Sequence, residues 1–135
     1  GPVLAGYWTG QRQPRLRLSI VFGFIAGALG YLGLAGAPSI AVACATIVLA
    51  HAGGSIVWVS STTLLQYQTE DRFRGRVFSA DFAFLVLSGS VASYAAGTLL
   101  DWGITVRMLA GATGLMALLP AVAWSFGLRL WKTAP

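Results

Sequence analysis

Polar side chains recur on one face of a long apolar stretch in the middle of the chain. Within residues 39–68 they follow one another at spacings of four, three, four and four, which places them on one side of an α-helix. A second apolar stretch, residues 77–100, carries a shorter row, which Asp101 continues. Inside a membrane, polar groups face a bundle interior or an aqueous cavity. The substrate-cavity candidates are His51, Ser55, Trp58, Thr62 and Gln66 (the first polar row) and Ser90 and Tyr94 (the second polar row).

A simpler alternative remains open for each of these groups. The hydroxyl of a Ser or Thr inside a helix often bonds back to its own backbone or to a neighbouring helix. His51 has three interpretations, namely an inert bond between helices, a substrate contact or proton coupling. We expect each row as a whole, more than any single member, to line a cavity.

The sequence shows none of the residue patterns that are typical of enzyme active sites or metal sites. Cys44 is the single cysteine, so the chain can form neither an internal disulfide nor a Cys/His metal set. The sequence contains no nucleophile–base arrangement and no glycine-rich phosphate loop. We therefore expect no enzyme activity, no metal site and no cofactor.

The composition indicates which elements carry the polar rows. Charged residues form 10% of the 135-residue chain, hydrophobic residues 56%, and the mean hydropathy is +0.73, whereas soluble domains are about 25% charged. With His51 neutral, the 52 residues from Leu18 to Thr69 carry no charge. One helix of that length would measure about 78 Å, far more than the roughly 30 Å hydrocarbon core. The stretch must fold back, and "GAPS" at 36–39 marks the break, with Ser39 placed to cap the next helix.

We therefore predict an all-α, polytopic membrane protein with four transmembrane helices. Backbone groups in a bilayer need partners within the chain, and segments this long and unalternating find them as helices, not as barrel strands. The predicted segments are the end of a preceding helix plus a loop at 1–15, transmembrane helices at 16–36, 39–68, 77–100 and 104–130, a loop at 69–76, and a tail at 131–135.

The basic residues predict the orientation. Eight of the nine Lys and Arg residues precede or open the first span, lie between the second and third, or lie at or after the end of the fourth, and four crossings bring these places to one side. The positive-inside rule makes that side cytoplasmic, so we expect cytoplasmic loops at 9–17 and 69–76 in the inner or plasma membrane. We interpret the net charge of +5 as basic residues that lie beside anionic lipid headgroups, and not as a sign of nucleic-acid binding.

The segment Gln68–Phe82, "QTEDRFRGRVFSADF", holds six of the thirteen charged residues. Its Asp81 lies roughly one and a half turns into the third span, where an unpaired carboxylate is costly. Either the helix N-terminus and interfacial water satisfy it, or it pairs with an arginine of the first loop and closes an inner gate. The gate or anchor candidates are Arg12, Arg15, Arg17, Arg72, Arg74, Gly75, Arg76 and Asp81.

Small residues four apart predict where helices approach one another closely. They are Gly23 and Gly27 in the first span, Gly89, Ser93 and Gly97 in the third, and Ala110 and Gly114 in the fourth.

This order of lipid-like, polar, polar and lipid-like helices resembles the last third of a major facilitator superfamily transporter. The segment "DRFRGRVFSADF" looks like the "LRGRVFS" segment between the tenth and eleventh helices of the drug and siderophore exporters in that superfamily. "GYWTGQRQPRLR" is similar to the loop after the eighth helix, but it lacks the acidic residue found there. The resemblance implies that the chain is a fragment, from the end of helix eight onward, of a twelve-helix fold whose tenth and eleventh helices face the central cavity.

The same resemblance implies secondary active efflux of small molecules. The implied partners are a small-molecule substrate, the lipid bilayer and the remaining helices of the same transporter. Two alternatives stay open: an autonomous four-helix protein such as a small dimeric multidrug transporter, and a non-transporting membrane module. The first span has no acidic residue, whereas small multidrug transporters resemble one another in carrying a coupling glutamate there.

Overall fold

The protein is all-α, with four helices that are each long and apolar enough to cross a membrane. The computed structural model describes the backbone of residues 2–133 and the side chains of residues 13–128. Its helices are α1 (Pro2–Ala35), α2 (Ile40–Gln68), α3 (Asp71–Asp101) and α4 (Val106–Thr133), and residues 2–133 contain no strand. The membrane-length segments are Gln13–Ala35, Ile40–Gln68, Asp71–Asp101 and Val106–Leu128, which confirms the predicted fold class.

The start of α2 and the end of α3 are each fixed by local hydrogen bonds. Ser39 precedes α2 in an extended conformation, and its hydroxyl accepts a hydrogen bond from the amide of Val42 at 3.4 Å, as predicted for a helix cap. Between α3 and α4, Gly103 adopts φ +87°, which a residue without a β-carbon adopts freely. The amide of Gly103 donates to the carbonyl of Leu100 and that of Ile104 to Leu99, both at 3.0 Å. These paired bonds form a Schellman motif that ends α3.

The charged segment is the start of a helix and not a loop. The prediction placed a loop at 69–76, but the structure leaves only Thr69 and Glu70 between α2 and α3, so that expectation was wrong. The acidic groups explain the difference: Glu70 pairs with Arg72 at 2.8 Å and Asp71 with Arg74 at 2.6 Å, and acids at a helix N-terminus are favourable. The 31 residues of α3 span about 46 Å, so its charged first turns can extend beyond a core of roughly 30 Å.

The first helix is also longer than expected. Where the prediction divides residues 1–15 into a helix end and a loop, α1 runs without a break from Pro2 to Ala35 and contains Pro14. An interior proline lacks a backbone donor and its ring crowds the carbonyl of residue i−4, yet the helix continues through Pro14. The expected loop therefore forms part of one continuous helix.

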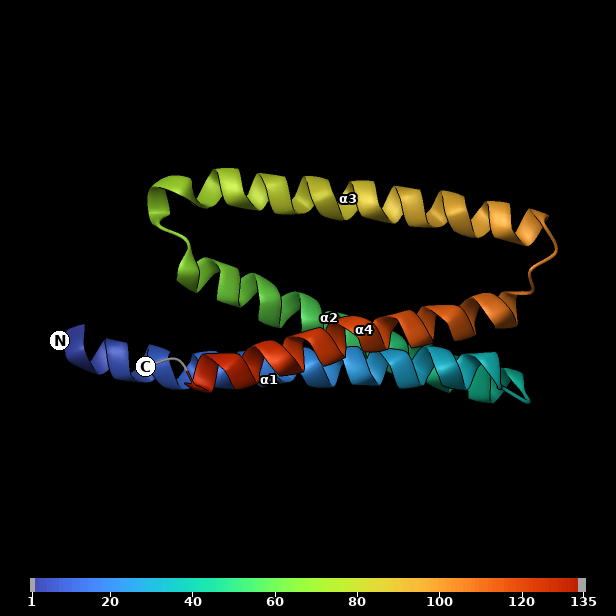
Figure 1. The fold of residues 1–135 in the computed structure, drawn as a ribbon, viewed down its shortest axis with the longest axis horizontal. Coiled ribbons are helices and arrows are strands. Elements are labelled where there is room, and N and C mark those ends of the chain that lie inside the picture. The colour runs from blue at the N-terminus through green and yellow to red at the C-terminus, as the bar shows by residue number, and fades with distance from the viewer. Residues whose placement is uncertain (1, 134–135) are drawn as a thin grey trace.

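Among the described residues, α1 packs along both α2 and α4, whereas α3 packs extensively on no other helix. Figure 1 shows α3 running apart from the other three, joined to them only through its two ends. No described residue of α3 is buried. The core of the molecule therefore lies around α1.

Small residues bring α1 and α2 together, as the spacing of Gly23 and Gly27 predicts. A β-carbon added to Gly53 of α2 would lie 2.5 Å from both the carbonyl oxygen of Gly23 and the amide nitrogen of Gly27. Gly114 of α4 also lies close to α1, since an added β-carbon would be 2.8 Å from the side chain of Leu32 and 3.0 Å from the carbonyl oxygen of Ala28. On α3 the outcome differs, because a β-carbon at Gly89 or Gly97 would meet no atom within 4 Å.

Candidate functional site

The first polar row lies on the side of α2 that faces away from α1. The buried residues of α2 are Ala50, Gly53, Ser60 and Leu64. At about 100° per residue, these positions cluster on one side of the helix, and the first polar row lies on nearly the opposite side. Of that row, Thr62 is half-buried and the other four residues are exposed. Packing against α1 therefore leaves the polar side of α2 available for other contacts.

Most hydroxyl groups in the helices bond to their own backbone. Ser55 donates to the carbonyl of His51, and Ser90 to that of Val86, each at 2.9 Å. These bonds follow the simpler of the two interpretations for each serine. A hydroxyl used in this way keeps an acceptor lone pair, so both serines can still accept a hydrogen bond from water or a ligand.

Thr62 is different. Its hydroxyl oxygen is buried and has no hydrogen-bond partner among the described residues. Its neighbour Thr63 donates to the carbonyl of Val59 at 2.7 Å. The first polar row therefore contains one hydroxyl, that of Thr62, whose hydrogen-bonding capacity is not used by the described residues.

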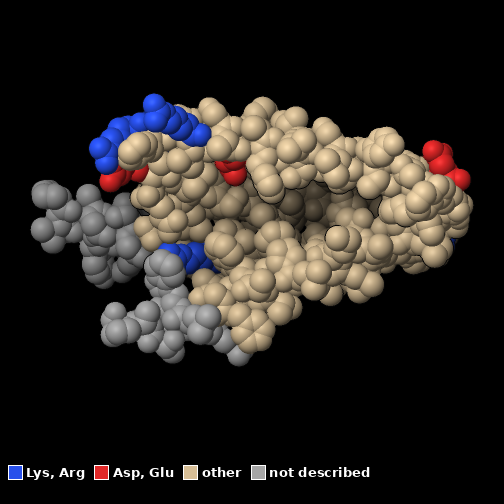
Figure 2. Space-filling model, turned by 45° about the horizontal axis from the view of Figure 1, so that its top comes forward, with Lys and Arg blue, Asp and Glu red and all other residues tan. Residues whose placement is uncertain are grey.

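The second polar row lies on the helix that stands apart. Ser90 and Tyr94 are both exposed on α3, and Tyr94 is 80% exposed. In Figure 2 the surface is hollowed between the α3 side and the rest of the bundle. The first and second polar rows thus lie on two helices that do not pack closely on each other.

Among the described gate and anchor candidates, those on α3 other than Asp81 lie in its first turns, and those on α1 lie near the start of its membrane-length part. Figure 2 shows the Lys and Arg side chains gathered mainly at one end of the molecule. The exposed candidates are Arg15, Arg72, Arg74, Gly75, Arg76 and Asp81. Arg17 is half-buried, and the Arg12 side chain lies outside the described residues. Neither of the two ion pairs among the described side chains includes Asp81. The pairing of Asp81 with an arginine of the first loop therefore stays a prediction.

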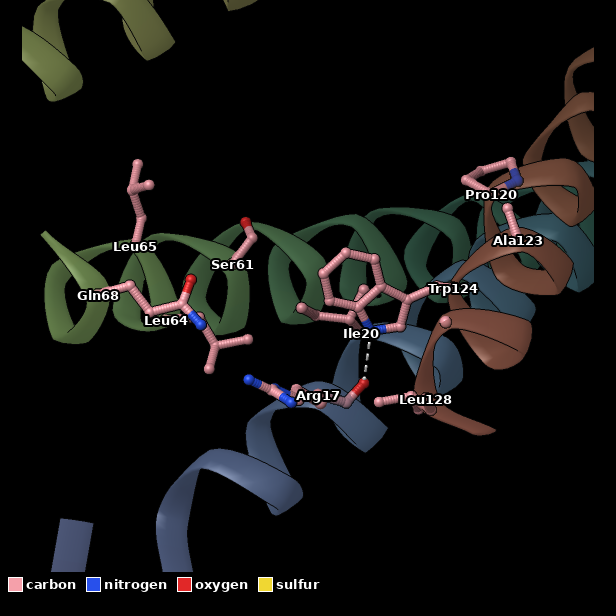
Figure 3. A pocket seen from close by; sticks show the side chains of 11 residues that line it. Arg17, Ile20, Ser61, Leu64, Leu65, Gln68, Pro120, Ala123, Trp124 and Leu128 are labelled. Atoms are coloured by element: carbon pink, nitrogen blue, oxygen red, sulfur yellow. Dashed lines mark hydrogen bonds between the residues drawn. The ribbon is translucent and has the colours of Figure 1, made fainter. Parts of the chain in front are cut away.

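A cavity that the sequence did not reveal lies between α1, α2 and α4. Its volume is about 560 Å³, and Arg17, Ser61, Gln68 and Trp124 are its polar lining residues. The indole N–H of Trp124 donates to the carbonyl oxygen of Arg17 at 3.1 Å, a contact drawn in Figure 3. Ser61, Gln68 and Trp124 belong to no polar row, and only the packing of three helices brings them together.

The described residues contain no group of three or more His, Cys, Asp or Glu side chains that could hold a metal ion. Cys44 is a free, exposed thiol. The polar groups described at the candidate site are those of the two polar rows and of the cavity that Arg17 lines. Comparison of the chain with protein-family models, curated proteins and solved structures finds no match.

Proposed function

We propose that the chain forms part of a secondary active transporter that exports small amphipathic molecules across a cell membrane. The observation that carries the proposal is the position of the first polar row on a membrane-length helix. The row lies on the side of α2 opposite its buried face, and its fourth residue, Thr62, has a buried hydroxyl without a partner among the described residues. Polar groups at membrane depth are costly in lipid, and they typically mark substrate or ion pathways.

The second polar row supports the same function. α3 is long enough to span the membrane, yet the described structure gives it no buried residue. In lipid, helices associate through van der Waals packing at small residues and through hydrogen bonds between helices, and Gly89 and Gly97 leave such a surface open on α3. Substrate sites in secondary transporters lie near the midplane between helix bundles. We assign the sides of α2 and α3 that carry the polar rows to such a path, and the remaining surface of α3 to further helices of the transporter.

The resemblance to the drug and siderophore exporters supports the direction and the substrate class of the proposal. It rests on the segment Asp71–Phe82, which forms the beginning of α3. Within it, Gly75 is exposed, and an added β-carbon would meet no atom within 4 Å. This surface is open to contact by another part of a transporter.

Cysteine accessibility on α2 tests the proposal. In a Cys44→Ala background, single cysteines replace Ser55, Ile56 or Leu64, and a membrane-impermeant thiol reagent is applied to the protein in its native membrane. Ser55 and Ile56 are both exposed, but only Ser55 belongs to the first polar row, whereas Leu64 faces the core at 6% exposure. We expect rapid labelling at Ser55 alone, because thiolate forms in water and is suppressed in apolar surroundings.

The two control positions separate the possible failures. Labelling of Ile56 as fast as Ser55 would show that the reagent does not distinguish the polar row from the rest of the exposed surface. Absence of labelling at Ser55 would mean that the first polar row meets lipid or another helix. Either result removes the transport path from α2.

A further inference from the structure

Two hydrogen bonds among the described residues attach α4 to α1 or to the turn that follows it. The indole N–H of Trp124 donates to the carbonyl oxygen of Arg17 at 3.1 Å, as drawn in Figure 3. The guanidinium of Arg107 donates through Nη2 to the carbonyl oxygen of Ala37 at 2.9 Å. In both bonds the donor is a side chain of α4 and the acceptor is a backbone carbonyl, so α4 is attached at two separate places.

The two bonds lie at opposite ends of the membrane-length segments of α1 and α4. Arg17 is near the start of the segment in α1, and Trp124 is near the end of the segment in α4. At the other end, Ala37 follows α1 and Arg107 is the second residue of α4. Ala37 follows Arg17 by 20 residues, a distance of roughly 30 Å in a helix and close to the thickness of the hydrocarbon core. The bonds therefore lie near the two membrane interfaces.

The Arg107 bond supplies a cap for α1 from another helix. The last turn of α1 contains no basic residue, and Ala37 just beyond it is buried, with 6% exposure. A buried backbone carbonyl needs a hydrogen-bond partner, and a cation near a helix C-terminus is favourable. Arg107 meets both requirements from the start of α4.

The Trp124 bond uses the only donor that an indole has. A carbonyl oxygen carries two lone pairs, so a carbonyl within α1 can accept this bond in addition to one from its own helix. Tryptophan is suited to the membrane interface, and hydrogen bonds between helices contribute to their association in lipid. Replacing the indole should therefore release α4 from α1 at this end.

Small residues bring α4 against α1 between the two bonds. Ala110, Gly114 and Ala121 are buried in α4, the helix that packs along α1. A β-carbon added to Gly114 would lie 3.0 Å from the carbonyl oxygen of Ala28. On α3, by contrast, no described residue is buried. The described contacts thus hold α4 in one register on α1 and hold α3 in no comparable way.

We propose that α4 is a strap fastened to α1 at both membrane interfaces, so that α1 and α4 move as one rigid unit while α3 changes position relative to them. A helix attached at one end only can tilt or rotate about that end. Two bonds separated by about the thickness of the hydrocarbon core prevent both movements. This inference rests on the contacts of α4 and does not depend on the transport proposal.

Distances between pairs of nitroxide labels, measured by electron paramagnetic resonance, test the strap. The protein carries the Cys44→Ala change and is reconstituted in lipid nanodiscs with one pair of labelled cysteines at a time. We expect narrow distance distributions for two pairs that involve α4 and a broader one for a pair that involves α3. The label positions, all exposed, are Leu18 and Val122 (the Trp124 pair), Ile40 and Met108 (the Arg107 pair), and Leu18 and Phe84 (the α3 pair).

Each bond is then removed separately. Trp124→Phe keeps an aromatic ring without the donor, and it should broaden the distribution of the Trp124 pair and shift it to longer distances while the Arg107 pair stays narrow. Arg107→Met should have the converse effect, and Arg107→Lys, which retains N–H donors on a long side chain, should have a smaller one. Trp102→Phe is the matched control at the exposed end of α3 and should change neither α4 pair.

Three results would overturn the proposal. With both bonds intact, an α4 pair as broad as the α3 pair would contradict a rigid unit. Broadening of both α4 pairs by one single variant would show a loosening of the whole molecule and not the release of one attachment. Unchanged distributions in both Trp124→Phe and Arg107→Met would show that the two bonds do not hold α4 on α1.

Discussion

Two adjacent threonines on α2 have opposite hydrogen-bonding states. The Thr63 hydroxyl bonds to the carbonyl of Val59, whereas the buried Thr62 hydroxyl has no partner among the described residues. A buried polar group without a partner costs about 1–3 kcal/mol. In a membrane, such a group is retained where water, a substrate or another helix completes its hydrogen bonds. Because Thr62 belongs to the first polar row, between Trp58 and Gln66, we assign this role to the contents of the transport path.

This assignment predicts the effect of Thr62→Val, which removes the hydroxyl and retains the branched shape. Transport of a fluorescent amphipathic dye should fall a few-fold, as the loss of one hydrogen bond of about 0.5–1.5 kcal/mol implies. The stability to thermal unfolding should be unchanged or slightly increased, because an unsatisfied group is lost.

Thr63→Val is the matched control for this prediction. It removes a hydroxyl that is bonded within the helix and should leave dye transport near the wild-type rate. If both variants reduced transport equally, or if Thr62→Val reduced only stability, the hydroxyl of Thr62 would have a structural role and no contact with substrate.

At the scale of the elements, the sequence predicted the helices better than their contacts. Hydropathy and the break at 36–39 were enough for four spans, and the cap at Ser39 follows from a local hydrogen bond. The loop expected within 1–15 is helical because α1 continues through Pro14, and the loop expected at 69–76 is mostly helical because α3 begins at Asp71. The cavity at Arg17 and Trp124 was not predictable, because its lining comes from three helices whose packing is not encoded locally.

The contact between α1 and α2 yields a prediction for two neighbouring glycines. Gly53→Ala places a β-carbon 2.5 Å from the backbone of α1, so the helices must separate, and overpacking typically costs about 1–3 kcal/mol. Gly54→Ala meets no atom within 4 Å and should be neutral or stabilising by up to about 1 kcal/mol through helix propensity. Equilibrium unfolding in detergent measures both variants. Equal stability of the two would contradict the close packing of α1 on α2 at Gly53.

At the scale of the whole molecule, three helices form a packed unit and one stands apart. α1 holds α2 and α4, while α3 exposes its small residues, including Gly89 and Gly97, to contacts that the described residues do not supply. Figure 1 shows that α3 is connected to the packed unit only through its ends. The transport proposal accounts for the separate position of α3. One side of α3 would contact further helices, and the side with the second polar row would contact water.

The central claim is that α2 and α3 line one aqueous path, and thiol reactivity on α3 tests it most directly. In the Cys44→Ala background, a cysteine at Ser90 belongs to the second polar row, and a cysteine at Ala92 lies on the opposite side of α3, at about 100° per residue. Both residues are exposed in the described structure, so the isolated chain gives no reason for a difference. In the native membrane, we predict that a membrane-impermeant reagent labels the Ser90 position at least about tenfold faster, which corresponds to one unit of thiol pKa between water and an apolar environment. The account also predicts that a transported dye slows labelling at both Ser55 and Ser90. Equal rates at positions 90 and 92, or protection by dye at only one of the two helices, would contradict a shared path.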